Sequence, residues 1–216
     1  NERLDQGART SYFHHSLGGY HGAKLGKYED IIYAHIYPGN VQVLNMLNAK
    51  YFILPDSDGK TIVQQNPYAL GNVWLIDSIK WVDSSNEELS SLNLIDTKTT
   101  VSINKKYQLD IPSFTSSSGS IKLVSYEPNQ LIYTCNLDTS SFAVFSEIFY
   151  PKGWEAYIDG VNVTHFPVNY ILRGLPVPSG KHEIIFQFKP KSFFVSAKVA
   201  LVASFLLIIT AFMTFI

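Results

Sequence analysis

The sequence predicts an α+β fold, with N-terminal helices and short strands, then a C-terminal antiparallel β-sandwich of about seven strands, and finally a transmembrane helix. Three observations support this prediction. Apolar residues recur at helical spacing in the first third of the chain, and β-rich segments separated by turn residues occupy residues 121–190. The last 18 residues contain no charged residue, proline or glycine. Together they indicate a folded region attached to a membrane.

Composition and charge restrict the class of protein. The chain has 216 residues, of which 46% are hydrophobic, so it can bury the core of one or two domains. It contains 17 basic and 18 acidic residues, and no segment is basic enough to follow a phosphate backbone, so we expect no nucleic-acid partner. The single cysteine, Cys135, excludes an intrachain disulfide. Because the chain starts at Asn1 without methionine, we expect it to be a piece of a longer protein.

Two helices are expected first. Apolar residues from Tyr20 to Ile32 recur near helical spacing, and Val43, Leu44 and Leu47 do so after a Pro-Gly-Asn break. Short strands follow at 50–54, 61–65 and 72–82, with Asp58-Gly59 as a hairpin turn between the first two. A short helix is predicted at 86–93, with Ser85 as its N-cap and two glutamates in its first turn.

A serine-rich segment at 113–120 suggests a flexible connection between subdomains. We therefore expect an α+β subdomain at 1–112, a linker at 113–120, a β-sandwich subdomain at 121–190 and a transmembrane helix at 197–216. Seven strands are predicted in the sandwich, among them 130–137, 154–158 and 161–166, and the alternation of Leu131, Tyr133, Cys135 and Leu137 places these residues on one buried face. Asp159-Gly160 suits a two-residue hairpin turn, and Trp154 is expected in the core rather than on a sugar-stacking surface.

The C-terminal segment predicts a membrane span. As a helix, Val199 to Ile216 would be about 27 Å long, close to the thickness of a bilayer core. The alternative is a buried core helix, since both kinds of helix lack a polar face. Lys189, Lys191 and Lys198 precede the span, and the positive-inside rule taken alone would place that side in the cytoplasm.

The stretch HHSLGGYHGAKLGKY, residues 14–28, is the candidate site. Its glycine spacing is one residue too short for a phosphate-binding P-loop, and its histidines do not share one face, so we expect neither a metal nor a cofactor. Glycines before a predicted helix, together with basic side chains, would instead suit a phosphate or an anionic sugar. The alternative is a solvated entry turn. The residues expected to bind the anion are Arg9, His14, Gly18, Gly19, His21 and Lys24.

Five segments, in order, resemble a known family. They are RTSYFHHSLGGYHGAKLGKYEDII, VLNMLNAKYFI, NPYALGNVWLI, FSEIFYPKGWEAYIDG and LRGLPVPSGKHEIIFQFKP. This pattern is similar to the C-terminal extracytoplasmic region of YfhO-like bacterial membrane proteins, and the SYFHHSLGGYHGAKL version is more like the Bacteroidetes forms. The resemblance runs nearly end to end through the closing hydrophobic helix. It implies a polytopic membrane protein.

The resemblance also implies an activity for the whole protein. YfhO-like proteins are similar to GT-C-type glycosyltransferases, which transfer sugars from polyprenyl-phosphate donors to cell-envelope polymers. Their catalytic carboxylate is expected in an early loop that this chain does not contain, so we expect no catalytic residue here. The region would assist acceptor or donor binding on the periplasmic or outer side of the cytoplasmic membrane. A carbohydrate-binding β-sandwich module and a structural cap on the membrane helices stay open as alternatives.

Overall fold

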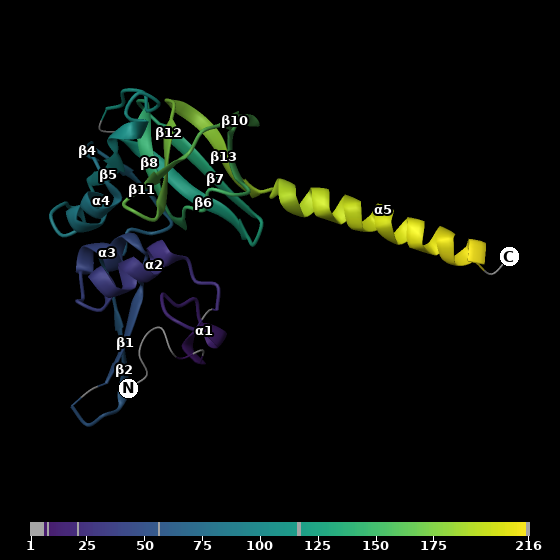
Figure 1. Cartoon of the computed structure of the whole chain (residues 1–216). Helices are drawn as coiled ribbons and strands as arrows, with labels where there is room; N and C mark the ends of the chain where they lie inside the picture. The colour runs from purple at the N-terminus through teal and green to yellow at the C-terminus, as the bar shows by residue number, and fades with distance from the viewer. Residues whose placement is uncertain (1–6, 8, 21, 56, 116–117, 215–216) are drawn as a thin grey trace.

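The computed structural model describes residues 7, 9–20, 22–55, 57–115 and 118–214, and it confirms the predicted α+β class. A β-rich body holds most of the chain, the N-terminal helices and a hairpin lie below it, and one long helix projects sideways from it (Figure 1). The chain therefore has an N-terminal part, a body and a projecting helix.

The N-terminal helices are shorter than the sequence pattern predicts. They are α1 (Arg9–Phe13), α2 (Gly26–Ile31), the π-helix η1 (Ile32–Ile36), which continues α2, and α3 (Val41–Met46). Asn40 caps α3, because its side-chain oxygen accepts hydrogen bonds from two backbone amides of the first turn. The expectation of a helix from Tyr20 onward is wrong, since the described residues between His14 and Leu25 are not helical and α2 begins at Gly26.

The predicted hairpin at Asp58-Gly59 is confirmed. Strand β1 (Tyr51–Pro55) pairs antiparallel with β2 (Thr61–Gln65), and Gly59 has a positive φ of 76° in the connection. The hairpin projects from the body (Figure 1), and most of its residues are exposed on both faces. Two strands alone have little independent stability, so α3, which precedes the hairpin, helps to hold it, with Asn66 donating a hydrogen bond to Asn45 at 2.9 Å.

The segment 72–82, expected as one strand, divides between two sheets. Strand β3 (Val73–Ile76) pairs with a strand of the sandwich, whereas β4 (Ser78–Val82) pairs in parallel with β5 (Thr100–Asn104). Helix α4 (Ser85–Ser91) connects β4 and β5, and the 3₁₀-helix η2 (Lys105–Tyr107) follows β5. The N-cap of α4 is Ser84, not Ser85, since the Ser84 hydroxyl accepts from the Glu87 amide at 3.1 Å.

The remaining strands form two antiparallel sheets. Their bounds are β6 (Gly119–Glu127), β7 (Gln130–Leu137), β8 (Ser141–Ile148), β9 (Trp154–Ile158), β10 (Val161–Val163), β11 (Phe166–Val168), β12 (Leu172–Val177) and β13 (Gly180–Phe188). The five-stranded sheet has the order β10-β9-β13-β7-β6, and the four-stranded sheet has the order β11-β12-β8-β3. The strand predicted at 161–166 is in fact two, because the chain crosses from one sheet to the other after Val163.

The two sheets enclose a first core. Tyr133 and Phe186 of the five-stranded sheet meet Phe145 of the other sheet, with ring centroids 4.9 and 4.8 Å from Phe145 in edge-to-face geometry. Such ring pairs contribute about 0.5–1.5 kcal/mol each beyond their burial. Cys135 is buried on the same face as Tyr133, as the alternating pattern of β7 predicts. Because β3 precedes residue 113, the sandwich includes a strand from outside 121–190; a subdomain boundary at 113–120 stays a prediction.

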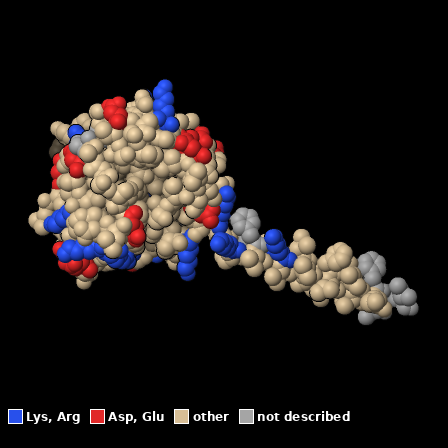
Figure 2. All heavy atoms as spheres, turned by 90° about the horizontal axis from the view of Figure 1, so that it is seen from above, with Lys and Arg blue, Asp and Glu red and all other residues tan. Residues whose placement is uncertain are grey.

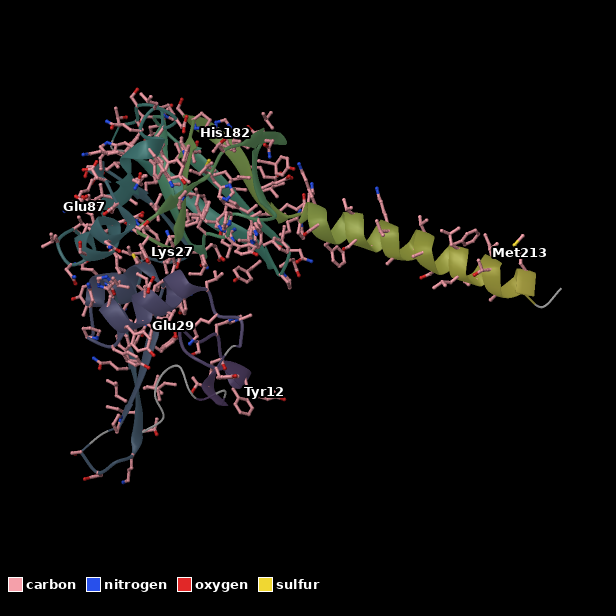
Figure 3. All side chains as sticks on the ribbon, viewed as in Figure 1. Tyr12, Lys27, Glu29, Glu87, His182 and Met213 are labelled. Atoms are coloured by element: carbon pink, nitrogen blue, oxygen red, sulfur yellow. The ribbon has the colours of Figure 1, made fainter. Side chains whose placement is uncertain are left out.

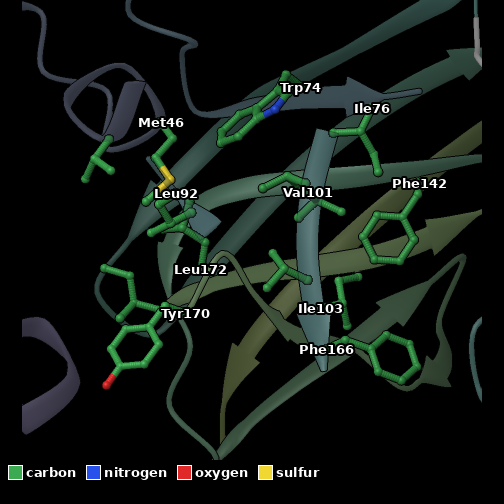
Figure 4. Close-up of a cluster of buried hydrophobic side chains, with 14 of the residues drawn as sticks. Met46, Trp74, Ile76, Leu92, Val101, Ile103, Phe142, Phe166, Tyr170 and Leu172 are labelled. Carbon is green, nitrogen blue, oxygen red and sulfur yellow. The ribbon is translucent and has the colours of Figure 1, made fainter. Parts of the chain in front are cut away.

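The four-stranded sheet is covered on its other face too. Phe142 and Val144 of β8 point into a second core, which Trp74, Ile76, Val101, Ile103 and Leu172 complete (Figure 4). Residues 141–145 are therefore all buried, which explains why FAVF in this strand is a continuous apolar run rather than an alternation. Tyr170 lies at the margin of this core with its hydroxyl directed away from it (Figure 4). The body thus has three layers.

Helix α5 (Lys191–Thr214) projects into solvent over its whole length (Figure 1). None of its most apolar window is buried, and by length and composition Lys191–Ala211 suffices to cross a membrane. Lysines lie only near the body on this helix (Figure 2). The alternative of a buried core helix is therefore wrong. The helix also begins earlier than residue 197, and Ile216 lies outside the described residues.

Candidate functional site

A cavity of about 300 Å³ lies between the N-terminal helices and the body. The start of α2, helix α4, the turn after β5 and the loop before β12 all contribute to its walls. Lys27 lies at this junction between α2 and the body (Figure 3). The side chains that carry its chemistry are Lys27, Tyr28, Glu88, Lys106, Tyr107, Phe149 and Tyr170. This volume is at the lower end of the range for small-molecule sites.

An unusual loop forms the floor of the cavity. Asn169 and Tyr170 have consecutive positive φ values of 47° and 71°, a conformation that costs free energy in residues other than glycine. The loop is held by Asn169, whose amide donates to the Ser102 carbonyl at 2.8 Å and whose side-chain oxygen accepts from the Ser102 amide at 2.8 Å. These bonds to β5 fix the backbone of Tyr170 within the cavity.

Tyr170 connects the two sides of the cavity. Its hydroxyl donates to the Asp30 carboxylate at 2.6 Å, its carbonyl accepts from the Lys27 ammonium at 3.2 Å, and the same ammonium lies 4.6 Å from its ring centroid. Burial and the bond to Asp30 raise the pKa of the Tyr170 hydroxyl to about 12, so it stays protonated at neutral pH. α2 is thereby attached to the loop of the body.

Glu88 places a carboxylate inside the cavity wall. It is only 4% exposed, and its Oε1 accepts from the Tyr170 amide at 3.0 Å. Burial raises the pKa of Glu88 above its ordinary value, although the bond from Tyr170 and the charges of Lys27 and Lys106 act in the opposite direction. A carboxyl group with a raised pKa beside two lysines in a cavity is a recognised mark of a functional site, but Glu88 also stabilises the strained loop.

Aromatic rings make up much of the remaining wall. The Lys106 ammonium lies 4.8 Å from the ring centroid of Tyr107, and Tyr28 donates its hydroxyl hydrogen to the Leu17 carbonyl at 2.6 Å. Burial raises the pKa of Tyr28 to about 12. The cavity thus offers two ammonium groups, one carboxylate and flat apolar surfaces. This combination suits a sugar ring that carries an anionic group.

Among the described residues, none of those predicted to bind an anion lines this cavity. Arg9 begins α1, the His14 side chain is exposed, Lys24 is half-buried, and His21 lies outside the described residues. The premise that the two glycines precede a helix is wrong, because α2 begins at Gly26. Binding of an anion by Arg9, His14, Gly18, Gly19, His21 and Lys24 stays a prediction.

The two glycines have local structural roles instead. The Gly18 amide donates to the Ser16 hydroxyl at 3.1 Å, so its hydrogen already has an acceptor within the loop. A Cβ on Gly19 would lie 2.8 Å from the Ser11 hydroxyl, and φ is +119°, so only glycine fits against α1 there. The same stretch does contribute Leu25, Lys27 and Tyr28 to the cavity. The stretch therefore borders the cavity through residues other than those predicted to bind an anion.

Exposed aromatic residues bear on the carbohydrate-module alternative. Among the described residues outside α5, most exposed aromatic side chains lie in the first 70 positions. Tyr126 is the exposed aromatic residue on the described strands of the sandwich. The described strands therefore carry no row of exposed rings for stacking on a polymer. Trp154 is half-buried, as part of the sandwich core, with the Arg173 guanidinium 4.1 Å from its ring. In the part of the chain that the structure describes, no cluster of three His, Cys, Asp or Glu side chains could hold a metal.

Comparison with known proteins gives one match. The family model for bacterial membrane protein YfhO matches residues 85–200, from α4 to the first part of α5. Comparisons with curated proteins and with solved structures found no match. The matched range includes Glu88, Lys106 and Tyr170 of the cavity, whereas Lys27 precedes it.

Proposed function

Because this chain belongs to the YfhO family of bacterial membrane proteins, we infer that it is the extracytoplasmic part of a membrane glycosyltransferase whose cavity binds an anionic sugar group. The match covers more than half of the chain, and α5 supplies a candidate membrane anchor, so the protein is membrane-associated. The sequence resemblance to GT-C-type enzymes supports glycosyl transfer and the extracytoplasmic side. The bound group would belong to a polyprenyl-phosphate sugar or to an acceptor polymer of the cell envelope.

The observation that carries this proposal is the composition of the cavity wall. Two lysines can neutralise a phosphate or carboxylate, while Tyr107 and Phe149 can pack against the apolar face of a sugar ring. Glu88 can accept hydrogen bonds from sugar hydroxyl groups, as its position beside the Tyr170 amide allows. The chain's role is therefore to bind and orient a substrate, and the resemblance assigns the catalytic carboxylate to another part of the protein.

Sugar transfer in membranes tests this proposal. Membranes containing the intact protein would be supplied with a radiolabelled polyprenyl-phosphate hexose, and label incorporated into envelope polymer would be measured. The double variant Lys27→Ala/Lys106→Ala should lose at least about tenfold in transfer, since charge-assisted bonds contribute about 1.5–3 kcal/mol each. Lys50→Ala/Lys98→Ala, which changes two lysines outside the cavity, is the matched control. Equal activity of both double variants and the wild type would contradict a role for the cavity.

A further inference from the structure

A buried arginine lies inside the sandwich, behind the wall of the cavity. Arg173 of β12 is 2% exposed, and its Nε donates to the Ile148 carbonyl at 3.1 Å. Its guanidinium carbon lies 4.1 Å from the ring centroid of Trp154 and 5.4 Å from that of Phe186. Burial lowers the pKa of Arg173 to about 10, so it is still a cation at neutral pH. A cation placed between two rings needs an acceptor to offset its lost hydration.

Three polar atoms in this region have no hydrogen-bond partner within the described parts of the chain. They are Nη1 of Arg173, the hydroxyl oxygen of Tyr133 and Nε2 of His165. All three side chains surround Phe186, whose ring centroid lies 6.2 Å from that of Tyr133 and 5.6 Å from that of His165. Tyr133 is fully buried, as Arg173 nearly is. Unsatisfied buried polar groups are uncommon in native proteins and call for an explanation.

Each of these groups can donate a hydrogen bond. Burial raises the pKa of the Tyr133 hydroxyl, so it keeps its proton. Burial lowers the pKa of His165 to about 4, so at neutral pH the ring is uncharged and carries one N–H. Arg173 has no acceptor atoms at all. A cluster of donors around one cation is suited to a ligand that only accepts, which is an oxyanion.

The cluster lies at the end of the sandwich from which α5 departs. Trp154 packs on Phe188 with ring centroids 5.3 Å apart, and the Gly153 carbonyl accepts from the Lys189 amide at 2.5 Å. Pro190 follows, and α5 begins at Lys191. The Arg173 cluster therefore lies near the start of the candidate membrane span, and the side chains of Trp154, Glu147 and His165 beside it are half-buried.

We propose that Arg173 and Tyr133, together with His165, bind a phosphate group at the end of the sandwich from which α5 departs. A phosphate has enough acceptor oxygens for all three donors, whereas a carboxylate has fewer. The phosphate would come from a lipid headgroup or from free phosphate. This site uses other side chains than the cavity, so it does not depend on the function proposed above.

Glu147 is the internal competitor for Arg173. Its charge acts on Arg173, and Arg173 in turn lowers the pKa of Glu147, although burial raises that pKa more. An ionised Glu147 would repel a phosphate, whereas a neutral amide side chain at this position would not. The variant Glu147→Gln should therefore bind phosphate more tightly, while Arg173→Met should not bind it. These opposite effects separate a ligand site from an arginine that only packs against Trp154.

The test is made with the full chain in detergent, in a Lys27→Ala/Lys106→Ala background that removes the cavity lysines. Binding of inorganic phosphate is measured by calorimetry, with acetate as the carboxylate arm. The protein with Glu147 intact should bind phosphate in preference to acetate, Glu147→Gln should bind at least about threefold more tightly, and Arg173→Met should lose binding at least about tenfold. Glu155→Gln, at the position after Trp154 on β9, is the control and should leave phosphate binding unchanged.

A second arm identifies the source of the phosphate. Nanodiscs of phosphatidylcholine with and without phosphatidic acid are compared for their effect on thermal unfolding of the same proteins. Stabilisation by phosphatidic acid that Arg173→Met abolishes supports a lipid headgroup, and binding of inorganic phosphate without that effect supports free phosphate. Absence of both effects, equal binding of acetate, or unchanged binding in Glu147→Gln would overturn the proposal. Because Glu147→Gln retains the arginine, it decides the matter even if Arg173→Met does not fold.

Discussion

Glu88 shows how one residue can connect the fold and the site. Its carboxyl is buried in the cavity wall and accepts from the Tyr170 amide, so it supports a loop with two strained residues. Its raised pKa means that the ionised form is less stable in the folded protein than in the unfolded chain. Sequence reasoning assigned Glu88 only to the first turn of a helix, because its contact with residue 170 is made between distant parts of the chain.

Glu88 therefore predicts a pH dependence of stability. For an acid whose folded pKa is raised, stability falls as pH rises from the unfolded pKa near 4.5 through the folded value. The variant Glu88→Gln keeps an oxygen for the Tyr170 amide but cannot ionise, so this loss should disappear. Thermal unfolding from pH 4 to 8 measures the difference. Glu87→Gln, an exposed neighbour on α4, is the control, and equal pH profiles for the wild type and Glu88→Gln would contradict the assignment.

Asp159 illustrates a turn residue with a second role. Asp159 and Gly160 have positive φ values of 49° and 79°, as the predicted hairpin requires. The structure adds an ion pair that the sequence did not reveal, since the Asp159 carboxylate accepts from Nδ1 of His182 at 2.6 Å and from the Glu183 amide at 2.9 Å. His182 lies on β13 at the upper edge of the body (Figure 3). The turn and the neighbouring strand are thereby joined.

This pair predicts a stability window. The hydrogen bond with Asp159 raises the pKa of His182. The contribution of protonated His182 to folding stability is therefore complete below its ordinary pKa near 6.5, and it is lost as pH rises through the pKa in the folded protein. The bond from His182 lowers the pKa of Asp159, so that contribution is lost as pH falls below about 3.8. Asp159→Asn should fold and keep the turn, yet lose the fall in stability above pH 6.5. A fall equal to that of wild type in pH-dependent unfolding would argue against the pair.

At the scale of elements, the hairpin between β9 and β10 can be tested through its backbone alone. A Cβ on Gly160 would meet nothing within 4 Å, so the cost of Gly160→Val comes only from its positive φ. We expect a loss of about 1–3 kcal/mol in the free energy of unfolding. Gly26→Ala, also with open space around its Cβ, should be neutral or slightly stabilising, since α2 begins there. Denaturant unfolding of both variants makes the comparison, and equal stabilities would contradict it.

Helix α5 is expected to contribute attachment rather than folding stability. Its apolar window is fully exposed, so removal of residues 191–216 takes away little of the packing of the body. The truncated protein should stay soluble without detergent and unfold within about 3 °C of the complete chain, corresponding to less than about 1 kcal/mol. Circular dichroism melting and size-exclusion chromatography measure both properties. Aggregation or early unfolding of the truncated protein would show that α5 packs on the body.

The sequence predicted elements well where one local pattern decided them. β7 and β9 have the predicted bounds, and the acidic first turn identified α4 to within two residues. Sequence patterns failed where contacts between distant residues decide the local structure. Residues 72–82 read as one strand because periodicity does not show a change of sheet at Asp77, and the pattern from Tyr20 suggested a helix although the chain turns until Leu25.

At the scale of the whole molecule, the fold class and the membrane attachment could be predicted, but the cavity could not. Its walls come from α2, α4, η2 and the loop before β12, which are far apart in the sequence. Its two lysines resemble ordinary surface residues in the sequence. The positive φ values of Asn169 and Tyr170 could not be predicted either, because neither residue is a glycine. The signal that did exist was the cluster of glycines and basic residues ending at Lys27 and Tyr28.

The most direct measurement of the central claim is binding of glucose 1-phosphate to the full chain in detergent, followed by calorimetry. The sugar phosphate should bind in the millimolar range or tighter, glucose without phosphate should bind far more weakly, and Lys27→Ala/Lys106→Ala should weaken the sugar phosphate at least about tenfold. Arg173→Met should leave this preference for the sugar phosphate over glucose in place. No binding, or binding that the two lysine substitutions do not change, would contradict the assignment of the cavity to an anionic sugar.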